Sequence, residues 1–191
     1  MDIRKLIAGL AVVCILSFSG SALAVSPEGA GEAEEHTVVV SVEDITAVME
    51  QLTEYEEDLN VLARLVYAEA RGIQSKAEQA AVIWCVLNRV DKGYWGDSIS
   101  GVVRARSQFA YSSSTPVNDG FLELAKDVVV RWLLEKRGIT DVGRVLPANY
   151  LYFAGRNGHN WFRKTYNSSS YWDWSLPDPY EEPTAAVEPA A

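Results

Sequence analysis

Apolar side chains recur at helical spacing along residues 59–72, and one charged residue lies within the stripe that they form. At 100° per residue these side chains fall within about 60° of one line, and Glu69 falls about 20° from its centre. The stripe consists of Leu59, Leu62, Leu65, Val66 and Ile73. The pattern therefore predicts an amphipathic helix that carries a carboxylate on its buried face.

A carboxylate on a buried face is costly unless it is hydrogen-bonded, paired with a cation or protonated. A protonated carboxyl group in such a place is what a general acid requires. The alternative is a structural Glu69 whose charge is satisfied by an arginine or by backbone amides. The helix alone leaves both interpretations open.

A second helix is predicted after a short turn, and it is apolar on every side. Ser75 and Glu78 have the spacing of a capping box, with serine at the N-cap and glutamate three residues further on. Residues 80–87 are continuously apolar, and Gly93 is a typical helix stop. These features predict a hairpin of two helices whose second member is buried nearly all round.

Further helices and then strands complete the pattern. Asp58, Asp97 and Asp119 are placed to cap helices, namely the helix that carries Glu69, a short helix to residue 103 and a helix that ends before residue 138. Aromatic residues near 150–153 and 160–166, joined by a glycine-containing turn, predict a β-hairpin. The predicted fold class is α+β, mainly α, with a small C-terminal β-hairpin.

The two ends of the chain differ in composition from its centre. Residues 1–24 combine two basic residues, a 13-residue apolar run and an A-x-A site, which is typical of a signal peptide. The run is shorter than the roughly 20 residues of a membrane span, so we expect export without a membrane anchor. We interpret residues 25–57 as an acidic linker with a possible helix, 58–177 as the domain and 178–191 as a disordered acidic tail.

Charge and composition argue against several classes of function. The chain has a net charge of −9, but residues 59–177 contain 15 basic and 10 acidic residues. A basic secreted domain suits a polyanion such as cell wall, although scattered charge on a solvent-exposed surface explains the excess equally well. Basic residues that neither cluster nor form a recognition motif argue against nucleic acid. The domain contains one cysteine, Cys85, predicted to be a core residue, and one histidine, His159. We therefore predict no metal site and no nucleophilic triad.

Five short blocks of the domain resemble a known family. They are VYAEARG at 66–72, AAVI at 80–83 continuing to VLNRV at 86–90, ISGVV at 99–103, QF at 108–109 and YF at 152–153. In this order and spacing they look like the catalytic domain of spore-cortex-lytic enzymes, the SleB-type cell wall hydrolases. The resemblance covers residues 59–166 and implies a single lysozyme-like domain related to lytic transglycosylases.

The resemblance implies that Glu69 is the catalytic acid and that peptidoglycan glycan strands are the substrate. Glu69 would protonate the glycosidic oxygen between N-acetylmuramic acid and N-acetylglucosamine. No second acid lies in a matched block, and Ile73 stands where many members have another glutamate. We therefore favour a lytic transglycosylase over a muramidase-type hydrolase, which needs a second carboxylate. A non-catalytic wall-binding module is a further alternative, but it leaves the acid on the apolar stripe unexplained.

Aromatic and amide side chains in the loops and hairpin suit carbohydrate, because sugar faces stack on aromatic rings and amides bind hydroxyl groups. The candidate substrate-binding residues are Gln108, Phe109, Tyr152, Asn160 and Trp161. We expect no cofactor. We expect a secreted monomer that acts in the cell wall.

Overall fold

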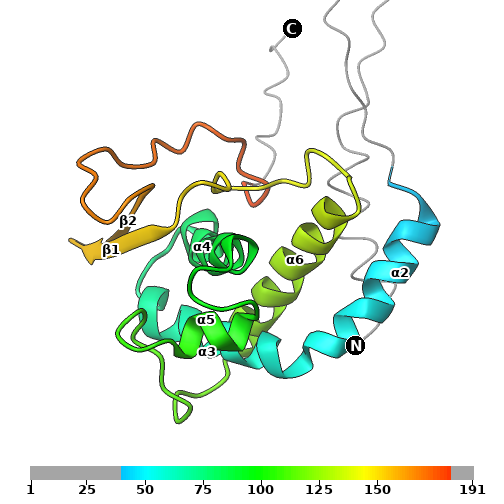
Figure 1. Ribbon diagram of the computed structural model, residues 1–191, viewed down its shortest axis with the longest axis horizontal. Coiled ribbons are helices and arrows are strands. Elements are labelled where there is room, and N and C mark those ends of the chain that lie inside the picture. Colours follow the sequence, from blue (N-terminus) through cyan, green and yellow to red (C-terminus); the bar gives the residue numbers. More distant parts are fainter. Residues whose placement is uncertain (1–39, 182–191) are drawn as a thin grey trace, which may run out of the picture. The chain divides into compact units, whose positions relative to one another are not determined.

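The computed structural model describes residues 40–181, and those from Val42 onward belong to one compact unit. The predicted signal peptide and most of the predicted linker lie outside the described residues. The elements are α2 (Val42–Leu52), a 3-10 turn η1 (Thr53–Tyr55), α3 (Glu56–Ala70), α4 (Lys76–Lys92), α5 (Ile99–Arg104), α6 (Asp119–Lys136), β1 (Tyr152–Arg156) and β2 (His159–Arg163). Figure 1 shows the hairpin on one side of α4 and α2 beyond α6 on the other. The mainly helical α+β prediction is confirmed.

Helix α4 is the central rod of the domain. Residues 80–89 are all buried, as expected for a run that is apolar on every side. The hydroxyl of Ser75 accepts a hydrogen bond from the backbone N–H of Glu78 at 3.1 Å, and Gly93 ends the helix in a left-handed conformation. Burial raises the pKa of Cys85 to about 12, so this thiol is an inert core group. The predicted N-cap at Ser75, the helix stop at Gly93 and the core position of Cys85 are confirmed.

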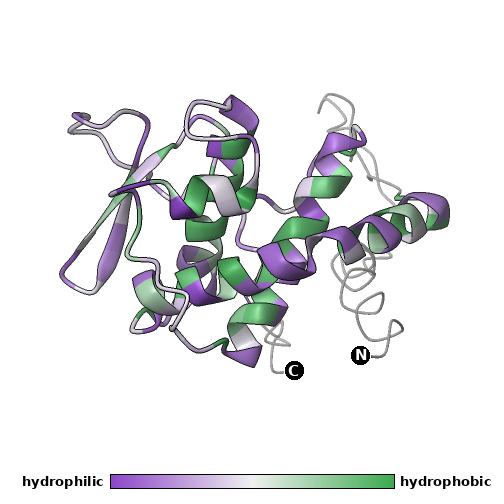
Figure 2. Cartoon of the chain, turned by 60° about the horizontal axis from the view of Figure 1, so that its bottom comes forward, coloured by the Kyte–Doolittle hydropathy of each residue, from purple (hydrophilic) through white to green (hydrophobic). Residues whose placement is uncertain are grey.

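Helix α3 packs on α4, α5 and α6 through its apolar stripe, every member of which is buried. Figure 2 shows that the helices carry both hydrophobic residues, in green, and hydrophilic residues, in purple. Glu69, however, is only half-buried, although Ala70 and Ile73 beyond it are buried. The predicted position of this carboxylate on a buried face is therefore correct only in part.

The three predicted aspartate caps were misplaced. The N-cap residues of α3, α5 and α6 are Tyr55, Ser98 and Asn118. The Ser98 and Asn118 side chains accept from the backbone N–H three residues on, so two predictions missed by one residue, which is the usual error at helix ends. Asp58 lies inside α3 instead. Its Oδ1 accepts from the backbone N–H and the hydroxyl of Ser100, so it ties α3 to the start of α5.

Both predicted domain boundaries differ from the compact unit. The acidic helix expected within the linker is α2, and it packs on α6 with Val48 and Leu52 buried. At the other end, residues 178–181 were assigned to the tail. The hydroxyl of Tyr180 donates to Asp127 on α6 at 2.7 Å, and burial raises the pKa of Tyr180 well above its usual value. These residues are therefore part of the packed domain.

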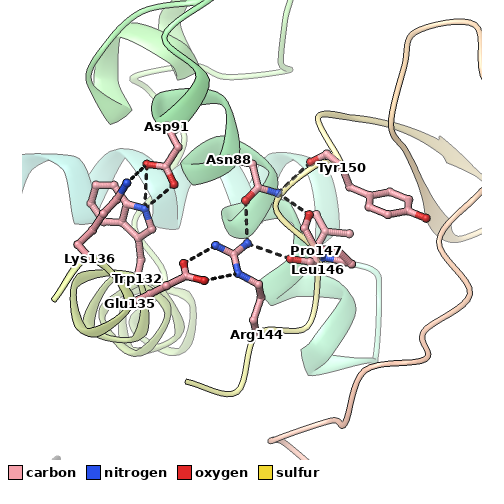
Figure 3. Close-up of polar contacts among 9 residues, drawn as sticks. All are labelled: Asn88, Asp91, Trp132, Glu135, Lys136, Arg144, Leu146, Pro147 and Tyr150. Carbon is pink, nitrogen blue, oxygen red and sulfur yellow. Dashed lines mark hydrogen bonds and ion pairs between the residues drawn. The ribbon is translucent and has the colours of Figure 1, made fainter. Parts of the chain in front are cut away.

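A polar network fixes the C-terminal half of α4 to α6 and to the segment that leads into β1 (Figure 3). The Asn88 amide donates to the carbonyl oxygens of Pro147 and Tyr150, both at 3.0 Å, and accepts from Arg144 at 2.7 Å. Arg144 in turn forms a bidentate pair with Glu135 at 3.1 and 2.6 Å. Because Asn88 is fully buried and its oxygen and nitrogen are both bonded, it fixes where the strand begins.

The β-hairpin has a two-residue turn. Asn157 and Gly158 both have positive φ, 54° and 77°, as a type I′ turn requires. The register places Phe153 opposite Phe162, so these two rings share one face of the hairpin and lie 5.3 Å apart. Phe162 is buried, so this is the face that packs against the helices.

Candidate active site

Three segments that are far apart in the sequence line an open cavity of about 260 Å³. They are the end of α3, the loop after α5 and strand β1, with one residue from α4. The lining residues are Glu69, Arg89, Ser107, Gln108, Phe109, Ala110, Phe153, Ala154 and Gly155. Glu69 is the only acidic residue among them. The cavity therefore has a single carboxylate in a wall of aromatic, amide and backbone groups.

The Glu69 carboxylate is held by the loop across the cavity. Its Oε1 accepts a hydrogen bond from the backbone N–H of Ala110 at 2.6 Å. Among residues 40–181, none donates a hydrogen bond to Oε2. One oxygen is thus fixed by the protein, and the other is left for a ligand in the cavity that Glu69 lines.

The loop after α5 is held in turn by Arg89, a buried side chain of α4. The Arg89 guanidinium donates to Gln108 Oε1 at 3.0 Å and to the carbonyl oxygen of Leu151 at 2.6 Å. It also lies 4.7 Å from the ring centre of Phe109. Gln108 and Phe109 follow Ser107, whose φ of 60° marks a sharp local bend. Arg89 therefore positions both predicted loop residues in the cavity wall.

A second buried side chain of α4 holds the hairpin. Glu78 is 5% exposed, and its carboxylate accepts from the backbone N–H of Asn160 and contacts His159 Nδ1 at 3.1 Å. The Asn160 amide donates to the backbone oxygen of Glu69 at 3.2 Å. Glu78 was predicted to close a capping box, but this carboxylate bonds to β2 instead. Asn160, which we expected at an exposed turn, is buried and bonds to the helix that carries Glu69.

The remaining two candidates lie outside the cavity lining. Tyr152 packs beside it, with its ring 5.4 Å from the Arg89 guanidinium. Trp161 is 41% exposed, donates from Nε1 to the backbone oxygen of Arg156 and packs against Tyr171. The structure thus brings Glu69, Gln108 and Phe109 into one site. Tyr152 contacts this site through Arg89, and Asn160 contacts it through the backbone of Glu69. Trp161 is on the surface of the hairpin.

A larger cavity, of about 410 Å³, lies between the start of α4 and the C-terminal segment. Its walls come mostly from residues 174–181, and its charged groups are Asp178 and Glu181. It contains none of the predicted site residues. The smaller cavity is the better candidate because it combines a partly exposed acid with fixed neighbouring groups.

Residues 73–178 match the Cell Wall Hydrolase family. The chain belongs to this family. The SleB-type resemblance is therefore confirmed, and the protein is an enzyme that acts on cell wall. The match begins four residues after Glu69, so most of the cavity wall lies within it and α3 precedes it. Comparisons with curated proteins and with solved structures find no match.

Two residues of this hydrolase site were missed by sequence reasoning. Arg89 was part of a matched block, and an arginine at the end of a helix that is otherwise buried is a signal for a buried cation. Glu78 gave no such signal, because its capping-box spacing explained it fully. Within the described part of the chain, no three His, Cys, Asp or Glu side chains cluster as metal ligands do, and no helix is long and apolar enough to cross a membrane.

Proposed function

We propose that the protein cleaves the glycan strand of peptidoglycan between N-acetylmuramic acid and N-acetylglucosamine, with Glu69 as the catalytic acid. The observation that carries this proposal is the cavity with Glu69 as its only carboxylate. Membership of the Cell Wall Hydrolase family supports the substrate class. The fixed Oε1 and the open Oε2 support the role of Glu69 as a group that exchanges a proton with a ligand.

In the proposed reaction, protonated Glu69 donates its proton to the glycosidic oxygen as the bond to the muramic C1 breaks. The departing N-acetylglucosamine leaves with that proton, and an oxocarbenium-like sugar remains. The backbone N–H of Ala110 stabilises the carboxylate that forms, because a hydrogen bond to the charged form favours it. The carboxylate then accepts the proton of the muramic 6-hydroxyl, whose oxygen bonds to C1. No water is consumed, and Glu69 returns to its protonated form.

Lytic transglycosylation is favoured over hydrolysis because the cavity has no partner acid. A hydrolase of the usual kind needs a second carboxylate within about 10 Å of the first, as a nucleophile or to activate water. Asp97 and Asp119, which were predicted only as helix caps, do not line the cavity. The 6-hydroxyl of the sugar itself is then the nearest nucleophile.

Mass spectrometry of the soluble fragments released from purified peptidoglycan tests this proposal. We expect fragments that end in 1,6-anhydro-muramic acid, which are one water lighter than hydrolysed fragments and resist reduction by borohydride. Reducible fragments would indicate a muramidase-type hydrolase. Fragments cut only in the peptide would reject glycan cleavage altogether.

We further propose that the protein is secreted through residues 1–24 and acts as a monomer on glycan strands in the wall. The support is the sequence pattern of these residues together with the substrate class of the family. N-terminal sequencing of the exported protein tests this, with a start at Val25 expected. An uncleaved N-terminus would reject it.

A further inference from the structure

The Glu69 cavity is small for the polymer that the proposed function requires. Ligand cavities usually have about 300–1,000 Å³, whereas this one has about 260 Å³. A glycan strand that is cut inside the chain must extend beyond such a cavity on at least one side. The surface next to the cavity therefore has to accommodate further sugars.

A continuous row of four aromatic rings runs past the cavity wall, and its two middle rings lie nearest to it. Arg89, which lines the cavity, lies 4.8 Å from the Trp95 ring and 5.4 Å from the Tyr152 ring. Trp95 contacts Tyr152 at 5.7 Å, Tyr94 contacts Trp95 at 5.8 Å, and Tyr166 contacts Tyr152 at 6.1 Å. We call Tyr94, Trp95, Tyr152 and Tyr166 the aromatic row.

The two end rings of the aromatic row are much more exposed to solvent than the two rings between them. Tyr94 is 78% exposed and Tyr166 is 69% exposed, whereas Trp95 and Tyr152 between them are half-buried. Rings exposed to this degree contribute little to a core, and all three contacts between neighbours in the row are ring contacts. Exposed tyrosine and tryptophan rings beside a glycosidase cavity suit the apolar faces of pyranose rings.

The charge around the aromatic row suits an anionic polymer. The Arg163 guanidinium lies 5.5 Å from the Tyr166 ring, and its buried Nε has no hydrogen-bond partner among the described residues. In the register of the hairpin, Arg163 is directly opposite Tyr152, so both share one face. In a peptide-free strand, the lactyl group of muramic acid adds a carboxylate to every second sugar. A cation beneath the row is therefore placed to attract it.

We propose that the aromatic row is a binding site for the part of the glycan strand that extends beyond the Glu69 cavity. This proposal rests on the proposed function, since it takes the same polymer as ligand. Tyr94 and Tyr166 contribute ring faces to sugars outside the cavity, and Trp95 and Tyr152 hold those rings in place. The row makes the enzyme prefer long strands over short fragments.

Binding of peptide-free glycan strands to the full chain tests this proposal. Titrations use the Glu69→Gln variant, so that the strands are not cut, and compare it with versions that also carry Tyr94→Ala and Tyr166→Ala. We expect the two alanine substitutions together to weaken binding of long strands about tenfold or more, since each lost stacking contact costs about two- to tenfold. The matched Tyr94→Phe and Tyr166→Phe substitutions keep the rings and should stay within about twofold, because stacking does not need the hydroxyl.

A chain-length comparison separates a binding role from a structural one. A disaccharide that fills only the cavity should bind equally well with and without the alanine substitutions. Equal losses for disaccharide and long strands, or unchanged binding of long strands, would overturn the aromatic row as a binding site. Release of fragments by the unsubstituted chain is measured separately. If strands bind through the aromatic row but no fragments are released, the proposed glycan cleavage is rejected, whereas the aromatic row is still supported as a binding site.

Discussion

The two ends of α4 hold the candidate site in different ways. At the N-terminal end, the single carboxylate of Glu78 bonds to β2. At the C-terminal end, Arg89 bonds to the segment before β1. Asn88 bonds to the same segment and also accepts from Arg144 (Figure 3). One side chain of α4 therefore holds the hairpin at the N-terminal end of the helix, whereas two side chains of α4 hold the segment that leads into the hairpin at the C-terminal end. One attachment of this kind can be lost by one substitution, whereas a network loses only part of its contacts.

Arg89 differs from Asn88, because it bonds both to the segment before β1 and to the loop that carries Gln108. Arg89→Met keeps most of the side-chain volume but leaves the Leu151 carbonyl without its donor and removes the cation from three aromatic rings. We expect a loss of about 3–4 kcal/mol in the free energy of unfolding, measured by urea denaturation, and loss of wall lysis.

The matched control is Arg106→Met, at an exposed arginine of the same loop. It should stay within about 0.5 kcal/mol of the unsubstituted protein. Equal effects of the two substitutions would show that Arg89 does not hold the site.

Glu78→Ala tests the single attachment. The substitution leaves the buried N–H of Asn160 without an acceptor, so we expect a loss of about 2–3 kcal/mol in the free energy of unfolding and a marked fall in wall lysis. Glu78→Gln keeps an acceptor oxygen in the same place and should lose less than half as much. If glutamine and alanine are equivalent, the charge of Glu78 and not its hydrogen bond to β2 is what matters.

Val48→Ala probes a contact far from both ends of α4. Val48 is fully buried where α2 packs on α6, and losing two methyl groups there should cost about 1–2 kcal/mol in the free energy of unfolding. Because α2 lies beyond α6 and the hairpin lies on the other side of α4 (Figure 1), the wall lysis rate of the folded protein should be unchanged. A fall in that rate well below the melting temperature would show that α2 contributes to the site.

His159→Ala should have the smallest effect. The His159 side chain is 65% exposed, and exposed ion pairs contribute between zero and about 1 kcal/mol. Urea denaturation should therefore show a loss of less than about 1 kcal/mol. A loss equal to that of Glu78→Ala would mean that Glu78 acts through His159 and not through Asn160.

The helices could be predicted from the sequence, whereas the contacts that hold the candidate site could not. Helices α3, α4 and α6 follow from apolar periodicity and from local caps such as Ser75, because these signals depend on neighbouring residues. The partners of Glu78, Arg89 and Asn160 lie 19 to 91 residues away in the chain. No local pattern distinguishes a capping-box glutamate from one that bonds to a strand. The stripe along α3 predicted the buried apolar residues correctly but not the partial exposure of Glu69 among them, which depends on the distant loop that carries Ala110.

The central claim is that Glu69 is the acid that cuts the wall, and Glu69→Gln tests it most directly. Glutamine keeps the volume and can still accept from the backbone N–H of Ala110, but it has no proton to give. Lysis of purified peptidoglycan is measured alongside circular dichroism and thermal unfolding. We predict that lysis is abolished while the spectrum is unchanged and the midpoint stays within a few degrees of the unsubstituted protein. Lysis that persists in a folded Glu69→Gln protein would contradict the account.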